Sequence, residues 1–200
     1  MVKLESLNRA FFLKINAGPA VPAWIVDGAT LIANYLIYMI PILLLGMWLW
    51  GDEPRRSLAL KACLVSLLAV GFNQIIGLAW QHPRPFMLGL GHTYLTHAPD
   101  SSFPSDHVTI FAGIGLSLLF SGAARLAFLF LTAGAAVAWA RVFLGVHFPL
   151  DMLGAVGIAC GAFAVVMPIW SKTGSTMTRL SEQLYRKVLA RLISSGWIRY

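Results

Sequence analysis

Long apolar stretches constrain this chain more than any other feature of its sequence. Four of them, near residues 22–50, 58–80, 124–145 and 149–170, are long enough to cross ~30 Å of hydrocarbon as helices. A shorter one, near 106–121, is just long enough for a further crossing. Backbone polar groups in lipid must bond within their own segment, so the stretches predict helices rather than open sheets. Composition agrees, because 12% of the residues are charged whereas soluble domains carry roughly 25%.

The number of crossings depends on residues 22–50. Pro41 is expected to kink this stretch. As one span it gives five crossings, whereas a break near Asn34 would give a sixth made of short pieces. We therefore expect an all-α integral membrane protein with a bundle of about five to six transmembrane helices. The bundle would occupy residues 22–170 of a single domain, 1–200.

Both ends of the chain have the pattern of helices that lie on a membrane surface. Residues 1–18 contain three basic residues and no signal-peptide core, and they predict an interfacial helix. Residues 171–200 predict a basic amphipathic tail attracted to anionic membrane lipids. The apolar positions that carry these predictions are Leu4, Leu7, Phe11, Phe12 and Ile15 in the first segment and Leu180, Leu184, Val188 and Leu192 in the second.

The net charge of +7 has a topological explanation and does not indicate a nucleic-acid partner. Basic residues gather in the tail and in two short connections, which the positive-inside rule places in the cytoplasm. The opposite ends of the spans, where the remaining polar residues lie, then face the periplasm or the cell exterior. With five crossings the N-terminal segment would lie outside, so its basic residues would not follow the positive-inside rule. Cys63 and Cys160 lie inside predicted spans, which favours packing roles over a disulfide or a metal site.

Three short polar islands at the same ends of the apolar stretches are the candidate functional residues. Ionisable groups at membrane depth are costly and usually functional. The long connection from Gln81 to Pro104 carries much of this polarity, and long connections in compact domains are usually functional as well. All five histidines lie on this side, which favours a common site: His82, His92, His97, His107 and His147.

The third island contains His147 and Asp151. Pro149 suits the first turn of a helix, so the last span should begin near Phe148. Asp151 would then lie in the first turn, where its carboxylate can reach back and hold one ring nitrogen of His147. The other nitrogen would be free to attack, as in a nucleophile with an orienting partner. Two alternatives remain: the pair could bind a metal, or Asp151 could only cap its helix.

The second and first islands supply a proton donor and cations. Ser105 precedes an apolar span and is a natural N-cap, and the amide groups after it would point at an anion. His107 is then placed to protonate a leaving oxygen, although an ordinary cap with a surface histidine is the alternative. Arg84 lies between two prolines, and its planar fork suits phosphate oxygens. Arg141 lies in an apolar run six residues before His147, where a snorkelling arginine is also possible.

The spacing Arg-Pro, Pro-Ser-x-His and Arg-x5-His-x3-Asp resembles the type 2 phosphatidic acid phosphatase superfamily. The runs from His97 to His107 and from Arg141 to Asp151 are most similar to its bacitracin-resistance type, the undecaprenyl pyrophosphate phosphatases. The resemblance covers nearly the whole chain in length and span order. It implies a bacterial inner-membrane enzyme that hydrolyses undecaprenyl pyrophosphate to undecaprenyl phosphate and recycles the cell-wall carrier lipid.

The resemblance also implies a role for each matching residue. His147 would attack phosphorus and become a phosphohistidine, Asp151 would orient it, and His107 would protonate the leaving group. Three residues would bind the phosphate oxygens: Arg84, Arg141 and Ser105. It implies no metal and no cofactor, and a polyprenyl pyrophosphate lipid as the substrate. A loose phosphoryl-transfer transition state depends mainly on positioning and charge stabilisation, which agrees with these roles.

Three positions depart from the family pattern. Gly77 stands where the broad family has a lysine, so one phosphate-binding cation is missing or replaced. Asp106 replaces the glycine of Pro-Ser-Gly-His, and its carboxylate must turn from the phosphate or take a partner. Ala140 replaces a serine. Secondary site candidates are Asp106, His97, Gln81 and His82.

Three other functions compete with this interpretation. A related enzyme would act on phosphatidate, phosphatidylglycerophosphate or lipid A phosphates, or transfer the phosphoryl group to another lipid. A transporter would use the polar residues as an ion relay, but a conduction path should reach both faces of the membrane. A metal hydrolase would be built on the histidine cluster.

Overall fold

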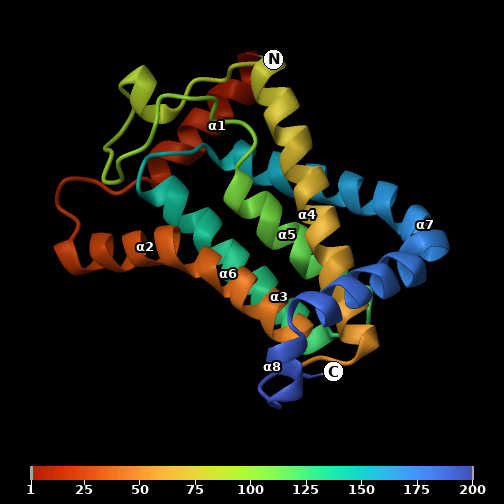
Figure 1. Cartoon of the computed structure of the whole chain (residues 1–200). Helices are drawn as coiled ribbons and strands as arrows, with labels where there is room; N and C mark the ends of the chain where they lie inside the picture. The colour runs from red at the N-terminus through yellow and green to blue at the C-terminus, as the bar shows by residue number, and fades with distance from the viewer. Residues whose placement is uncertain (1, 200) are drawn as a thin grey trace.

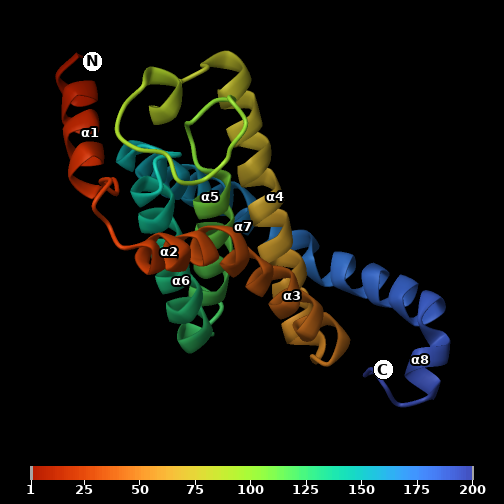
Figure 2. The same ribbon diagram turned by 90° about the vertical axis from the view of Figure 1, so that its left-hand side faces the viewer.

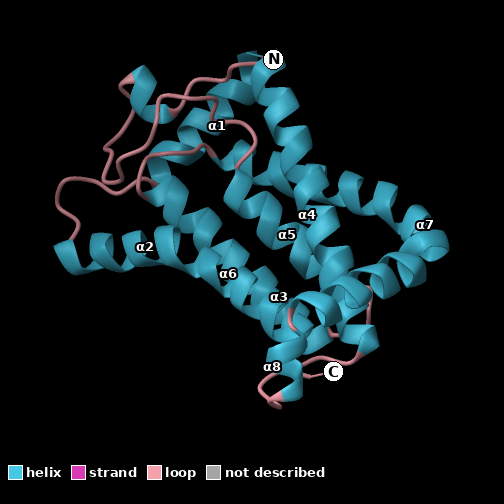
Figure 3. Cartoon of the chain, viewed as in Figure 1, coloured by secondary structure: helices cyan, strands magenta, loops and turns pink. Residues whose placement is uncertain are grey.

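The computed structural model describes residues 2–199, so Met1 of the expected interfacial helix and Tyr200 of the tail lie outside the described residues. The described chain is helical and contains no strand (Figure 3). Its α-helices are α1 (Val2–Ile15), α2 (Ala23–Tyr35), α3 (Met39–Leu49), α4 (Glu53–Ala79), α5 (Asp106–Leu119), α6 (Ala124–Phe143), α7 (Pro149–Val188) and α8 (Ala190–Ser194). Two 3-10 turns join them, η1 (Leu36–Tyr38) and η2 (Pro85–Leu88).

The expected all-α membrane fold is confirmed. Four segments are long and apolar enough to cross a membrane by length and composition: Ala23–Leu49, Glu53–Ala79, Ala124–Phe143 and Pro149–Val188. The shorter apolar helix α5 lies among them, where the sequence predicts the additional crossing. Figure 1 shows α1, the long connection and one set of helix ends at the top, with α8 and the C-terminus at the bottom.

Helix α5 is the centre of the bundle and packs against α4, α6 and α7. Phe111 and Ile114 of α5 are buried in a cluster with Phe130 and Val137 of α6. Gly134 permits this close approach, because a Cβ there would lie 2.7 Å from the Cβ of Phe111. Small residues at helix contacts are typical of membrane bundles. The central helix is therefore held by close packing on several sides, and its N-terminus is fixed in place.

The first span bends at η1, between the two positions that the sequence singles out. Pro41 has no N–H to donate to the carbonyl of Ile37, so the α-helical pattern is interrupted in the preceding turn. Helices α2 and α3 follow one another across this bend (Figure 2). Helix α2 packs on α6, whereas α3 packs on α4. The segment Ala23–Leu49 is thus bent, and by length and composition it is long and apolar enough for one crossing.

Helix α1 packs across the end of the bundle where α6 finishes and α7 begins. Asn8 is buried, and its side-chain oxygen accepts a hydrogen bond from the backbone N–H of Leu150 at 3.1 Å. Phe12 is buried against Phe148, with ring centroids 5.3 Å apart. The exposed apolar side chains of α1 include Leu4, Leu7 and Phe11. The helix thus has one face on the protein and an apolar face turned outward, as an interfacial helix requires.

Helix α7 is 40 residues long and continues past residue 170, where the sequence places the end of the bundle. It bends midway (Figure 1), and Pro168 inside the helix provides the cause. Its distal part returns to α4, where the buried guanidinium of Arg56 pairs with Glu182 at 3.2 Å and lies 4.7 Å from the ring of Tyr185. The apolar tail residues Leu180, Leu184, Val188 and Leu192 stay exposed, so the membrane-surface role of the tail remains a prediction.

Candidate active site

A group of polar side chains lies at the end of the bundle that α1 covers. Here α4 and α6 end, α5 and α7 begin, and the connection from residue 80 to 105 folds over them. A pocket of about 420 Å³ opens between these elements. The predicted site residues that line it are Gln81, His82, Arg84, His97, Asp106, His107, Arg141 and His147. Ser105 and Asp151 are buried and do not line it.

His147 is placed by a tight turn and by the start of α7. Gly145 has a φ of +85°, and a Cβ there would collide with the carbonyl oxygen of His92, so only glycine fits this turn. Helix α7 begins at Pro149 with Phe148 as its N-cap, as the sequence predicts. The His147 imidazole is 1% exposed, so neither nitrogen is freely hydrated. Its orientation is therefore set by the protein.

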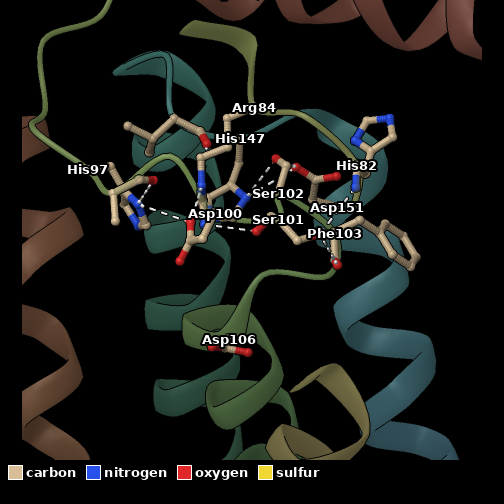
Figure 4. A network of polar contacts seen from close by, with 12 residues as sticks. His82, Arg84, His97, Asp100, Ser101, Ser102, Phe103, Asp106, His147 and Asp151 are labelled. Atoms are coloured by element: carbon tan, nitrogen blue, oxygen red, sulfur yellow. Dashed lines mark hydrogen bonds and ion pairs between the residues drawn. The ribbon is translucent and has the colours of Figure 1, made fainter. Parts of the chain in front are cut away.

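Asp151 holds this imidazole in the way that its helix position predicts. Its Oδ2 lies 3.1 Å from Nδ1 of His147 and accepts the backbone N–H of Phe148 at 2.8 Å. The same oxygen accepts a hydrogen bond from the hydroxyl of Ser102 (Figure 4). A carboxylate that accepts from Nδ1–H leaves the lone pair of Nε2 as the free basic position of the ring.

Arg84 lies directly beside that free nitrogen. Its Nη1 donates to the carbonyl of Val146 at 2.9 Å and lies 3.1 Å from Nε2 of His147. Its Nε donates to Asp100 at 2.8 Å, and Nη2 donates to the carbonyl of Ser101 at 3.1 Å. The guanidinium is 4% exposed, and Figure 4 shows these partners around it. A charged arginine and a neutral imidazole thus meet at one edge of the pocket.

Two further predicted residues are buried and have polar atoms without a protein partner. Arg141 is 3% exposed, and its Nε makes no hydrogen bond to the described residues. Ser105 occupies the N-cap position of α5, but its hydroxyl does not cap the helix and also has no partner among the described residues. Ser105 is thus the N-cap residue of α5, as the sequence predicts, although its side chain makes no capping hydrogen bond. Buried polar atoms in proteins are nearly always hydrogen-bonded, so both groups are candidates to bind a ligand.

Asp106 takes a partner, as its place in the family motif requires. Its Oδ1 accepts from the side-chain amide of Asn73 at 2.8 Å, and Oδ2 accepts from that of Gln74 at 3.1 Å. Both amides come from α4, one turn before Gly77. In Figure 4 Asp106 lies on α5, apart from the network around His147.

The histidines of the long connection differ in where their rings point. His97 is the nearest to the pair, with its ring centroid 6.2 Å from that of His147. The ring of His82 packs edge-on against Phe148, and its Nε2 lies 3.6 Å from the carboxylate of Glu5 in α1. His92 does not line the pocket, and its backbone bonds to Asn16 instead. Four of the five histidines therefore surround the pocket.

Sequence reasoning missed two side chains of this site, Ser102 and Asp100. Ser102 is fully buried behind the His147–Asp151 pair, and Asp100 pairs with Arg84. Both belong to the run of residues that carries the family resemblance, directly before the second island. Their position in this run indicates that they lie near the site, but it does not show which of the side chains point into it.

The pKa values of the ionisable groups around the pocket are set by burial and by the charges of Arg84 and Arg141. Burial lowers the pKa of His147 well below its usual range, Arg141 and Arg84 lower it further, and Asp151 opposes the change. Burial also lowers the pKa of His97. For Asp100 burial acts upward, but the hydrogen bond and charge of Arg84 prevail and lower its pKa. At neutral pH the imidazole of His147 is therefore uncharged and its Nε2 carries a lone pair.

These features define a helical membrane enzyme with a site for an anionic, electrophilic group. A neutral imidazole with an orienting carboxylate can attack, and two buried guanidinium groups can bind the oxygens of a phosphoryl group. The described residues contain no group of three or more His, Cys, Asp or Glu side chains placed to hold a metal ion.

The chain belongs to the PAP2 superfamily, whose model matches residues 58–175. It is 35% identical to the putative undecaprenyl-diphosphatase YbjG of Escherichia coli (strain K12) over 198 residues, which is 98% of this chain and 99% of that protein. It is 33% identical to the undecaprenyl-diphosphatase BcrC of Bacillus subtilis (strain 168) over 128 residues, 64% of this chain and 66% of the relative. The expected membrane phosphatase class is thereby confirmed.

Solved structures share the fold. The crystal structure of Aquifex aeolicus LpxE matches with a TM-score of 0.67 and 23% identity, over 81% of this chain and 95% of that one. The PAP2-type phosphatidylglycerolphosphate phosphatase from Bacillus subtilis matches with a TM-score of 0.62 and 20% identity, over 86% and 88% of the two chains. At these identities the likeness concerns the arrangement of the helices.

The two buried arginines of the pocket, Arg84 and Arg141, should each be required for turnover. Replacing Arg84 or Arg141 with alanine should lower kcat/KM by about 10²–10³, the usual scale for one donor to a developing oxyanion. Lysine at either position should restore activity only partly, because its point charge cannot form a bidentate fork. Steady-state kinetics of the purified variants in detergent would measure this. Full activity of both alanine variants would remove these residues from the site.

Proposed function

We propose that this enzyme hydrolyses undecaprenyl pyrophosphate to undecaprenyl phosphate and inorganic phosphate, and so recycles the carrier lipid of cell-wall synthesis. The observation that carries the proposal is the His147–Asp151 pair beside Arg84, with Arg141 free to bind in the same pocket. The relatives from Escherichia coli and Bacillus subtilis are named as a putative undecaprenyl-diphosphatase and an undecaprenyl-diphosphatase, which supports this lipid as the substrate.

In the proposed reaction Nε2 of His147 attacks the terminal phosphorus. A P–N bond forms, the bond from phosphorus to the bridging oxygen breaks, and undecaprenyl phosphate leaves. Since Arg84 Nη1 lies 3.1 Å from Nε2, the substrate must draw this guanidinium from the nitrogen onto a phosphate oxygen. Arginine therefore covers the nucleophile until an anion binds.

The remaining groups complete the cycle. His107 at the start of α5 would give a proton to the leaving oxygen. It would then take a proton from the water that hydrolyses the phosphohistidine, releasing phosphate and regenerating His147. Arg141 Nε, the Ser105 hydroxyl and the first amides of α5 would share the charge of the transferring group.

The lipid chain of the substrate would leave the pocket on the side of α4. Leu78 and Met87 line the pocket there, and their side chains are 82% and 46% exposed. Gly77 lies between this rim and Ser101, and it contributes no side chain. An apolar rim next to a charged pocket suits an amphiphile whose head group binds at the membrane surface.

A substrate panel tests the proposed function directly. Purified enzyme in detergent should release phosphate from undecaprenyl pyrophosphate with a higher kcat/KM than from phosphatidate, phosphatidylglycerophosphate or lipid A phosphates. Excess chelator should leave the rate unchanged. A clear preference for a monoester would assign the enzyme to another lipid phosphate, and complete loss of activity in chelator would indicate a metal hydrolase.

The two histidines should respond differently to the leaving group. Alkoxide departure from a monoester needs a proton, whereas a lipid phosphate leaves a pyrophosphate as a stabilised anion. His107→Ala should therefore lower monoester hydrolysis by about 10²–10⁴, the usual scale for general acid catalysis, and lower pyrophosphate hydrolysis much less. His147→Ala should abolish both activities and the acid-labile phosphoenzyme.

Two results would contradict these assignments. Equal losses on both substrates would make His107 a phosphate-binding residue rather than the proton donor. Phosphoenzyme that persists in His147→Ala would place the nucleophile at another residue.

We also propose that the pocket faces the periplasm or cell exterior of a bacterial inner membrane. In a background with both native cysteines replaced by alanine, Thr96→Cys samples the pocket side and Ser175→Cys samples the distal part of α7; both positions are exposed. An impermeant thiol reagent added to intact cells should label Thr96→Cys and not Ser175→Cys. The reverse pattern would place the active site in the cytoplasm and contradict an external recycling role.

A further inference from the structure

Ser102 is a fully buried hydroxyl residue that no part of the proposed reaction uses. Its Oγ donates to Oδ2 of Asp151 and lies 3.4 Å from Nδ1 of His147. The backbone N–H of Ser102 donates to the carbonyl of His82 at 2.7 Å, which fixes the position of the residue. The hydroxyl is therefore held at the junction of the two side chains that form the nucleophilic pair.

The hydrogen bonds of Asp151 show what this hydroxyl does. Oδ2 receives three donors: the hydroxyl of Ser102, the backbone N–H of Phe148 and Nδ1 of His147. Oδ1 has no partner among the described residues. Because the N–H of Phe148 and the hydroxyl of Ser102 both come from fixed positions, the carboxylate has one favoured orientation. Nδ1–H of the imidazole then has a single acceptor to follow.

The neighbours of Ser102 in sequence hold the other half of the site. Asp100 and Ser101 accept hydrogen bonds from Nε and Nη2 of Arg84. Three consecutive residues thus bind the phosphate-binding arginine on one side and the orienting carboxylate on the other (Figure 4). This segment thereby sets where Arg84 and the His147–Asp151 pair lie relative to one another before substrate binds, and phosphoryl transfer depends on such positioning.

We propose that Ser102 is a positioning residue: its hydroxyl fixes the carboxylate of Asp151, and thereby the tautomer and orientation of His147. The inference rests on the proposed role of His147 and Asp151, but not on the identity of the lipid. If the hydrogen bond of Ser102 served only to avoid an unpaired polar group in the interior, its removal would leave the pKa of His147 unchanged.

The pH dependence of His147 distinguishes these roles. The hydrogen bond from Ser102 stabilises the carboxylate and makes it a weaker acceptor toward the imidazole. Without it, Asp151 should bind the imidazolium more strongly, so the pKa of His147 should rise. The titratable and charged groups that face His147 are Asp151, Arg84, Arg141, His97 and His107. Ser102→Ala removes the hydrogen bond to Asp151 and the 3.4 Å contact of the same hydroxyl with Nδ1 of His147, and it leaves all of these charged groups in place.

The kinetic test compares Ser102→Ala with Ser102→Thr and with Ser117→Ala. Ser117 is an equally buried serine whose hydroxyl bonds within α5, to the carbonyl of Gly113 at 2.8 Å, so it is the matched control. Ser102→Ala should lower kcat by about 10–100-fold, the scale of a hydrogen bond to a charged group, with little change in KM. The acid limb of kcat/KM should move to higher pH. Ser102→Thr should recover most of kcat, and Ser117→Ala should resemble the wild type.

A second measurement needs no substrate. In ¹⁵N-histidine-labelled protein the imidazole signals of His147 are those absent from His147→Gln. In Ser102→Ala these signals should titrate at higher pH than in the wild type, and in Ser117→Ala they should not change. An unchanged titration in a folded Ser102→Ala protein, judged by an unaltered Tm, would overturn the inference.

The two measurements separate this inference from the proposed function. Failure of the wild type on the whole lipid panel would reject the proposed function, while the titration would still test Ser102. A wild type that hydrolyses the lipid, with Ser102→Ala equal to it in kcat and in titration, would reject only the positioning role.

Discussion

The burial of two guanidinium groups at the pocket end of an apolar bundle is the constraint on which the rest of this structure depends. A buried charge is tolerated only when it is paired or hydrogen-bonded. Arg84 meets this requirement with one carboxylate and two carbonyl groups, all from the connection above the helices or the turn before α7. Arg141 does not, since its Nε has no partner among the described residues. An anion with several oxygens would satisfy both groups, and the fold therefore favours a phosphorylated ligand.

The direction of the helices adds to this preference. Helices α5 and α7 begin at the pocket, so their N-terminal ends point positive partial charge toward it. Helix α6 ends there, and Arg141 lies in its last turn, where a cation is favoured. Close packing around α5 fixes these ends relative to one another. The bundle thus places attractive groups before any substrate arrives, which lowers the reorganisation that phosphoryl transfer requires.

Much of this arrangement could be predicted from the sequence, because apolar length and helix-start signals act locally. The spans follow from continuous apolar stretches. The beginning of α7 at Pro149 and the reach of Asp151 back to His147 follow from residues within about one turn of each other. The contacts of Ser102, Asp100 and His82 could not be predicted from the sequence, because each of them joins the long connection to another element. The N-cap position of Ser105 follows from local sequence as well, but local sequence does not show that its hydroxyl makes no capping hydrogen bond.

The two main departures from the family pattern, at positions 77 and 106, belong to one wall of the pocket. Gly77 follows Asn73 by one turn on the face of α4 that lines the pocket, and Asp106 receives its hydrogen bonds from Asn73 and Gln74 of that face. The carboxylate is thus satisfied by neutral amides, and no lysine at position 77 is available to pair with it. A carboxylate paired with neutral donors keeps its negative charge, which repels an anion. The positive charge of the pocket is consequently carried by Arg84, which lies beside Nε2 of His147, and by Arg141.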